Sequence, residues 1–332
     1  MSSKIGIIGT GSCLPSIVVT CDEMDQALNA RPGWTQRATG IRERRRAPAE
    51  TSLSDLAVDA GRAALRTAGV RADQVRAVIV ATVTPDPPVP AAATRVQDRL
   101  GLTDAFAFDL NAACAGFLFA LEVARPLAGA DAERPYVLVI GGDVWSRMID
   151  PLDRTTWPLF GDGAGAVVLG PVDSGGFLAT KLATSGALGD LAVGGYSSAL
   201  PGPDPASTDH LFKMRGAEIS DLMMAELPRL VQTVTDMAGV KVADVDYLIC
   251  HQANPKLVGR CAEQAGFAPE QNVNTGEIFG NTVAASVPLG IDVAVRDGRL
   301  RPGSLVILAA FGAGMSWGAT LVEWSSLGLR EE

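Results

Sequence analysis

The sequence has few of the residues that build metal centres and disulfide frameworks. It holds two histidines, His210 and His251, and five cysteines with no C-x-x-C pair among them. A zinc site needs a tetrahedral set of such ligands at short spacings, so we expect no bound metal. Cysteines this sparse in a chain of 332 residues also argue against a disulfide framework and favour a reducing, cytoplasmic location.

Long apolar runs and an excess of positive charge are also missing. No apolar run is long enough to cross a membrane, and the first residues lead directly into a strand-like segment, so we expect neither a signal peptide nor a membrane span. The net charge of −9 disfavours nucleic acid and anionic membranes as partners. The hydrophobic content of 47% is enough for one large α/β unit or two modest domains.

Helix and strand patterns alternate along the chain, which predicts a layered α/β fold with buried sheets. Residues 52–69 have the spacing of an amphipathic helix that stops at Gly69, and 75–83 and 136–142 are nearly all apolar, as in buried strands. Residues 186–210 are rich in Gly, Pro, Ser and Asp and predict a long loop, in which we expect His210 to be structural. Residues 32–46 predict a basic loop, either a solvated surface or a rim for a phosphate-bearing ligand.

An internal repeat divides the chain. The pattern of residues 68–85 recurs in 238–255 at a constant offset of 170, held by glycine and proline. Later segments follow more loosely. The repeat predicts two similar halves, 1–172 and 173–332, each running helix, strand, loop, strand, helix, strand.

Cys114 lies where a strand-like run (105–110) meets a helical pattern (117–124). A helix N-terminus favours an anion, so we expect the thiolate, which is the nucleophilic form. The small residues around Cys114 would let a substrate carbonyl approach the backbone. The alternative is a buried, inert cysteine, and this stretch alone does not decide between the two.

His251 and Asn281 follow strand-like and glycine-turn segments in the second half. By the repeat, two halves packed about a pseudo-twofold axis would bring Cys114, His251 and Asn281 to one cleft. A thiol nucleophile, an imidazole and an uncharged amide are the groups that acyl transfer through an oxyanion requires. Taken singly, His251 could be a core histidine and Asn281 a turn residue. Their joint position favours a catalytic site.

The chain resembles the ketoacyl-ACP synthase III family of the thiolase fold over essentially its whole length. The similarity is carried by five motifs: 112–116 (AACAG), 251–254 (HQAN), 280–286 (GNTVAAS), 161–165 (GDGAG) and 311–318 (FGAGMSWG). The resemblance implies a five-layered αβαβα homodimer. It also implies that acyl-CoA loads the cysteine, and that decarboxylative condensation with a malonyl thioester then gives a β-ketoacyl product.

The same resemblance assigns roles by position. Cys114 would be the nucleophile, His251 and Asn281 would bind the malonyl thioester carbonyl, and the backbone N–H groups of Cys114 and Ala313 would form a second oxyanion hole. No cofactor would be bound permanently, because coenzyme A enters as a thioester substrate. Residues implied in the coenzyme A site are Trp34, Arg37, Arg154, Gly216, Ala253 and Asn254; in the acyl pocket, Val89, Trp157 and Phe311; and in carrier docking, Lys256.

Several positions depart from the family pattern. Where the family has an arginine two residues before its Gly-Ile-Arg motif, this chain has Ala38, next to Arg37. Where the family commonly has an asparagine in the coenzyme A tunnel, this chain has Ala217. The positions usually basic for docking acyl carrier protein hold Asp221, Glu263 and Gln264. Because that carrier is acidic, like charges would weaken docking, which favours a specialised-metabolism enzyme over ordinary fatty-acid initiation.

One specificity prediction concerns Val89, which matches the position that reaches across the dimer to close the partner's acyl pocket. Valine is smaller than the phenylalanine of acetyl-preferring relatives, so chains longer than acetyl should fit. Two alternatives to condensation stay open. The Cys114 acyl group could pass to an alcohol or amine, or the chain could be a non-catalytic subunit, which the intact trio disfavours.

Overall fold

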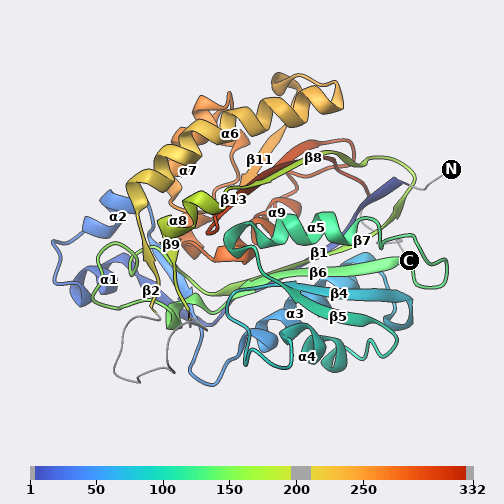
Figure 1. Cartoon of the computed structure of the whole chain (residues 1–332), viewed down its shortest axis with the longest axis horizontal. Helices are drawn as coiled ribbons and strands as arrows, with labels where there is room; N and C mark the ends of the chain where they lie inside the picture. Colours follow the sequence, from blue (N-terminus) through green and yellow to red (C-terminus); the bar gives the residue numbers. More distant parts are fainter. Residues whose placement is uncertain (1–3, 196–210, 327–332) are drawn as a thin grey trace.

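Two mixed sheets and three layers of helices alternate through the molecule (Figure 1). The computed structural model describes residues 4–195 and 211–326. From one side to the other the layers are α3 and α4, the first sheet, α5 and α9, the second sheet, and α6 and α7 (Figure 1). The expected five-layered αβαβα architecture is therefore confirmed.

The first sheet has the strand order β1-β7-β6-β4-β5. The strands are β1 (Lys4–Cys13), β4 (Val75–Ala81), β5 (Phe106–Leu110), β6 (Tyr136–Asp143) and β7 (Gly163–Val172). The central strand β4 is parallel to both β5 and β6, whereas β7 is antiparallel to β6 and β1. Side chains of β4 are buried on both faces, which explains its continuous apolar run.

The second sheet has the order β11-β12-β13-β8, with β11 parallel to β12 and the other pairs antiparallel. The strands are β8 (Gly176–Thr184), β11 (Tyr247–Cys250), β12 (Leu305–Gly312) and β13 (Ser316–Glu323). Asn272 adds a single parallel bridge to Leu248 in β11, at the place that β5 takes beside β4. The two sheets therefore have the same strand order, with β8, β13, β12 and β11 in the places of β1, β7, β6 and β4.

The first outer helix has the bounds that the sequence predicted. Ser52 caps α3 (Leu53–Ala68), and the helix ends at Gly69, which has the left-handed φ of 64°. The long α6 (Gly216–Ala238) ends in the same way at Gly239, with φ 71°. These two glycines are 170 residues apart, so the halves share the backbone conformation of this helix end as well as its sequence.

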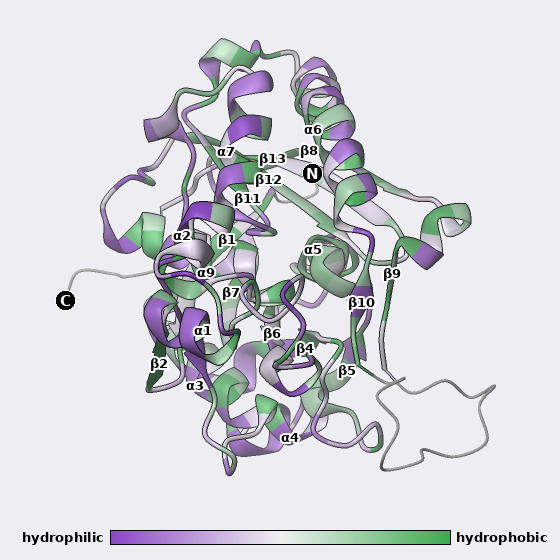
Figure 2. Ribbon diagram, turned by 90° about the vertical axis from the view of Figure 1, so that its left-hand side faces the viewer, coloured by the Kyte–Doolittle hydropathy of each residue, from purple (hydrophilic) through white to green (hydrophobic). Residues whose placement is uncertain are grey.

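The remaining helices separate by hydropathy (Figure 2). The central α5 (Gly116–Ala124) is mostly hydrophobic, whereas α4 (Ala92–Arg99) and α6 mix polar and apolar residues and each bury one face. The other helices are α1 (Cys21–Ala27), α2 (Trp34–Thr39), α7 (Pro255–Gln264), α8 (Gly276–Phe279) and α9 (Ser286–Arg296). The short strands are β2 (Ile17–Thr20), β3 (Glu43–Arg46), β9 (Ala192–Val193) and β10 (Lys213–Met214).

Two predicted loops are partly wrong. The loop expected over 186–210 begins with a 3₁₀ turn, Gly186–Leu191, and the strand β9, which pairs with β10; residues 196–210, including His210, lie outside the described part. The basic loop over 32–46 forms α2 and β3 instead. Within it Arg44 is buried and donates to the carbonyls of Trp157 and Phe160, so its charge serves packing rather than a phosphate.

Within residues 4–195 and 211–326, no helix is long and apolar enough to cross a membrane. Nor do three or more His, Cys, Asp or Glu side chains in those ranges lie together as metal ligands would. All five cysteines are free.

Candidate active site

Cys114 lies on a 3₁₀ turn, Ala113–Ala115, between β5 and α5. Ala113 has φ 48°, an uncommon conformation for a residue with a Cβ. The Asn111 side chain supports it, because its Oδ1 accepts from the Ala113 N–H at 3.1 Å. The sharp turn places Cys114 ahead of the first residue of the buried helix.

The same turn occurs in the second half. Val283 has φ 53° on the 3₁₀ turn Val283–Ala285 that precedes α9, and its N–H donates to Asn281 Oδ1 at 2.9 Å. Asn281 is 170 residues beyond Asn111, so the two asparagines hold equivalent turns. Because the carbonyl oxygen of Asn281 is engaged, its Nδ2 is the group left to act as a donor.

Each turn packs against a strand of the other half. A Cβ at Gly312 in β12 would lie 2.8 Å from the Cys114 nitrogen, and a Cβ at Gly141 in β6 would lie 2.3 Å from the Ala284 oxygen. Only glycine allows these approaches. The reciprocal packing carries Cys114 onto the second sheet and Asn281 onto the first. The Asn281 N–H also donates to the Leu159 carbonyl at 2.8 Å.

His251 directly follows β11 and is 2% exposed. Its Nδ1 lies 3.2 Å from Ser286 Oγ, which is in turn 3.2 Å from Thr282 Oγ1. Burial lowers the pKa of His251 to about 4, so the imidazole is neutral near pH 7. When Ser286 donates to Nδ1, the remaining ring proton is on Nε2 and is available to a substrate oxygen.

The thiolate expected at Cys114 is wrong for the free protein. Burial, together with the negative charge of Asp143, raises the pKa of the thiol well above its usual value. The helix N-terminus acts weakly here, because the cysteine lies on a 3₁₀ turn ahead of α5 rather than in its first turn. The resting nucleophile is a neutral thiol.

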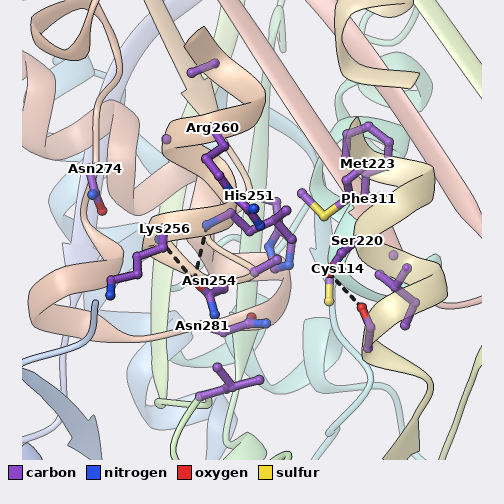
Figure 3. A pocket seen from close by; sticks show the side chains of 18 of the residues that line it. Cys114, Ser220, Met223, His251, Asn254, Lys256, Arg260, Asn274, Asn281 and Phe311 are labelled. Carbon is purple, nitrogen blue, oxygen red and sulfur yellow. Dashed lines mark hydrogen bonds between the residues drawn. The ribbon is translucent and has the colours of Figure 1, made fainter. Parts of the chain in front are cut away.

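A cavity of about 1130 Å³ connects these residues (Figure 3). Figure 3 shows His251 and Asn281 close to the Cys114 side chain, with α6 on one side and α7 on the other. Nine of the predicted site residues line this cavity: Cys114, Gly216, His251, Ala253, Asn254, Lys256, Asn281, Phe311 and Ala313. Asn254 also caps α7, because its Oδ1 accepts from the Lys256 and Leu257 N–H groups.

Three residues expected to bind coenzyme A do not line the cavity, namely Trp34, Arg37 and Arg154. Arg154 lies over the Trp34 ring, 6.0 Å from its centroid, and donates to the Leu28 carbonyl. An adenine could enter between this pair only if the guanidinium moved away from the ring. Arg37 is exposed and donates to the Pro32 carbonyl, and it does not line the cavity; its neighbour Ala38 does.

The two other acyl-pocket residues lie elsewhere in the single chain. Trp157 packs under Arg44, whose guanidinium is 4.3 Å from the ring centroid, and it does not line the cavity. Its place in the acyl pocket therefore stays a prediction, since that pocket was expected to be completed by a second chain. Val89 is 83% exposed and does not line this chain's own cavity.

Sequence reasoning missed an aromatic wall beside Cys114. Phe160 and Phe212 line the cavity with ring centroids 5.5 Å apart, and Trp145 packs behind both, at 5.8 and 5.2 Å. Trp145 and Phe160 follow β6 and precede β7, where strand ends meet the site, which is the one signal that could have indicated them. Phe212, distant in sequence, gave no such signal.

Comparison with known proteins places this geometry in a family. Residues 108–186 match the family model described as 3-Oxoacyl-[acyl-carrier-protein (ACP)] synthase III, and residues 235–324 match its C-terminal model. The Beta-ketoacyl-[acyl-carrier-protein] synthase III of Erythrobacter litoralis is 42% identical over 326 residues, covering 97% of this chain and 99% of that protein. The Acetoacetyl CoA synthase NphT7 of Streptomyces sp. CL190 is also 42% identical, over 97% and 99% of the two chains.

Solved structures agree with the sequence matches. The priming β-ketosynthase from the R1128 polyketide biosynthetic pathway superposes with a TM-score of 0.91 at 29% identity, covering 98% of this chain and 97% of that chain. This likeness extends the agreement from sequence to the thiolase fold over nearly the whole of both chains. The chain belongs to the 3-oxoacyl-[acyl-carrier-protein] synthase III family.

Proposed function

We propose that the protein condenses an acyl thioester with a malonyl thioester to give a β-ketoacyl product. One observation carries the proposal: the thiol of Cys114, the neutral imidazole of His251 and the free amide of Asn281 meet in one cavity. A nucleophile facing two uncharged donors suits acyl transfer followed by enolate formation. The family membership supports the same reaction.

In the first step, Cys114 Sγ attacks the acyl thioester carbon, coenzyme A leaves as the thiol, and an acyl-S-cysteine forms. In the second, a malonyl thioester binds with its carbonyl oxygen between His251 Nε2–H and Asn281 Nδ2. Loss of CO₂ leaves an enolate at that oxygen, which these donors stabilise. The enolate carbon attacks the acyl carbonyl, and the Cys114 sulfur departs as the β-ketoacyl product forms.

Intact-protein mass spectrometry with a panel of acyl-CoAs, followed by malonyl-CoA, tests this assignment. An acyl adduct that malonyl-CoA discharges with CO₂ release supports condensation. An adduct that malonyl donors leave unchanged, but an alcohol or amine discharges, would favour the alternative acyltransferase. No adduct from any acyl-CoA or acyl carrier protein would indicate a non-catalytic subunit.

The extender is proposed to be carried by coenzyme A rather than by acyl carrier protein. Glu263 lines the cavity from α7 and is exposed, Asp221 is exposed on α6, and Lys256 donates its ammonium to the Arg37 carbonyl. Glu263 and Asp221 thus place negative charge at this rim beside Lys256 and Arg260, which weakens the docking of an acidic carrier protein. The name of the acetoacetyl-CoA synthase relative, whose product is a CoA thioester, points the same way.

We expect Glu263→Lys to raise kcat/KM for malonyl-ACP several-fold and to change that for malonyl-CoA much less. The reason is that the substitution removes a repulsive charge where a carrier would dock. The matched control is Asp73→Lys, which makes the same charge change at the opposite end of β4 from the site. Equal gains in both variants, or none in Glu263→Lys, would contradict a carrier repelled at this rim.

The enzyme is proposed to act as a homodimer joined at β5. This strand ends the first sheet, and no strand within residues 4–195 and 211–326 pairs with its outer edge; its Phe106 is 46% exposed while stacked on Phe108. An open apolar edge favours pairing with a second copy. Val89 would then project toward the partner's acyl pocket. We place the enzyme in the cytoplasm, where free thiols stay reduced.

If Val89 closes the partner's pocket, Val89→Phe should shorten the acyl chains that load. Loading of four- to eight-carbon acyl-CoAs should fall strongly, while acetyl-CoA loading stays nearly unchanged, because the larger ring fills the far end of the pocket only. Competitive loading followed by intact-mass analysis measures this ratio. Val89→Ala is the control and should keep the longer chains. A wild type that prefers acetyl-CoA would overturn the inference from valine.

A further inference from the structure

Asp143, the last residue of β6, is a fully buried carboxylate that the mechanism does not use. Its Oδ1 lies 2.9 to 3.2 Å from the Thr82 and Thr84 hydroxyls and the Val83 and Thr84 N–H groups. Its Oδ2 accepts from the Ala284 N–H at 3.1 Å. No ion pair to Asp143 occurs in the described ranges 4–195 and 211–326, so dipoles alone hold the charge.

The donor from the second half occupies a distinctive place. Ala284 is the residue equivalent to Cys114, at the same position of the repeated turn and 170 residues further on. By strand register Asp143, the last residue of β6, is equivalent to Gly312, the last residue of β12, which directly precedes Ala313, whose N–H is expected to face the substrate oxyanion. The second half therefore presents its turn N–H to a built-in carboxylate, where the first half presents the same N–H to substrate.

We propose that Asp143 is a positioning residue: its carboxylate fills the anion site of the Val283–Ala285 turn and so holds Asn281 in place against Cys114. This inference rests on the proposed condensation. The hydrogen bonds give the mechanism directly. Thr82, Val83 and Thr84 fix the carboxylate to the first half, and Ala284 ties the second-half turn to it. Asn281 precedes that turn and accepts from its Val283 N–H, so a shift of the turn would also move Asn281.

The same charge acts on the nucleophile. Asp143 contributes to the raised pKa of the Cys114 thiol, after burial. The other titratable groups around the cavity are His251, neutral near pH 7, and the rim residues Lys256, Arg260, Glu263 and Glu277. Removing the Asp143 charge should therefore ease ionisation of the thiol while it disturbs the Asn281 turn. The first effect should speed alkylation of Cys114, whereas the second should slow condensation.

Asp143→Asn provides the test. Asparagine keeps the shape, but its NH₂ must face either the Thr82–Thr84 donors or the Ala284 N–H, so one set loses its acceptor. We expect condensation by the acylated enzyme to slow on the order of 10- to 100-fold, as for small misplacements of catalytic groups. We also expect iodoacetamide to alkylate Cys114 faster at pH 7, with the pH–rate profile displaced to lower pH. General damage to the fold would slow both reactions.

Asp292→Asn is the matched control. Asp292 is also buried and also joins the halves, through Thr10 and Ser12 of β1, but it lies away from the cavity. It should shift neither readout. If Asp143→Asn fails to fold, Thr84→Val keeps the charge and removes one donor, and should slow condensation without moving the alkylation profile to lower pH.

Unchanged condensation in a folded Asp143→Asn enzyme, or in Thr84→Val, would overturn the inference. Slower alkylation that parallels slower condensation would do the same, because it would make Asp143 merely structural. A wild type that acylates but never condenses would instead contradict the proposed function. Acylation and condensation are measured separately, so the two failures are distinguishable.

Discussion

Replacing Cys114 with alanine is expected to abolish the acyl adduct and to lower kcat/KM for condensation on the order of 10⁴-fold or more, as loss of a catalytic nucleophile does elsewhere. The other cysteines cannot substitute. Cys250 and Cys261 are buried, and Cys13 and Cys21 do not line the cavity. Intact mass after incubation with acyl-CoA measures the first effect, and release of β-ketoacyl product measures the second.

The variant should keep one partial activity. His251 and Asn281 do not depend on the thiol for their positions, since their partners are Ser286 and Val283. Malonyl-CoA should therefore still lose CO₂ in Cys114→Ala, giving acetyl-CoA and no condensed product. Cys21→Ala is the control and should acylate normally. An adduct that persists in Cys114→Ala would assign the nucleophile to another residue.

Local signals were enough to predict most of the fold. Helical spacing and Gly69 predicted the helix over 52–69, and the apolar run from Val75 predicted a strand covered on both faces. The repeat predicted two similar halves, and the two sheets have the same strand order. Each of these features depends on the residues of one continuous segment, so it can be recognised from the sequence of that segment.

The features that sequence reasoning missed depend on contacts between distant segments. Arg44, over one hundred residues away, packs on the ring of Trp157, a contact that the sequence did not indicate. Phe212 lines the cavity with Cys114, although it follows β8 and is almost one hundred residues further along the chain. The thiolate prediction failed for a similar reason: the helix N-terminus is visible in the sequence, whereas burial and the charge of Asp143 are not.

The second large effect is expected at Asn281, and two substitutions separate its possible roles. Asn281→Ala removes both the donor in the cavity and the Oδ1 that accepts from Val283 N–H, whereas Asn281→Asp keeps the acceptor and loses the donor. If the donor stabilises the enolate, both should lower the condensation rate on the order of 10²- to 10³-fold, the usual cost of losing an oxyanion donor. Acylation of Cys114 should change little. Single-turnover CO₂ release from malonyl-CoA on the acylated enzyme measures the step. A near-normal rate in Asn281→Asp would show that the turn, and not the amide donor, is what the reaction requires.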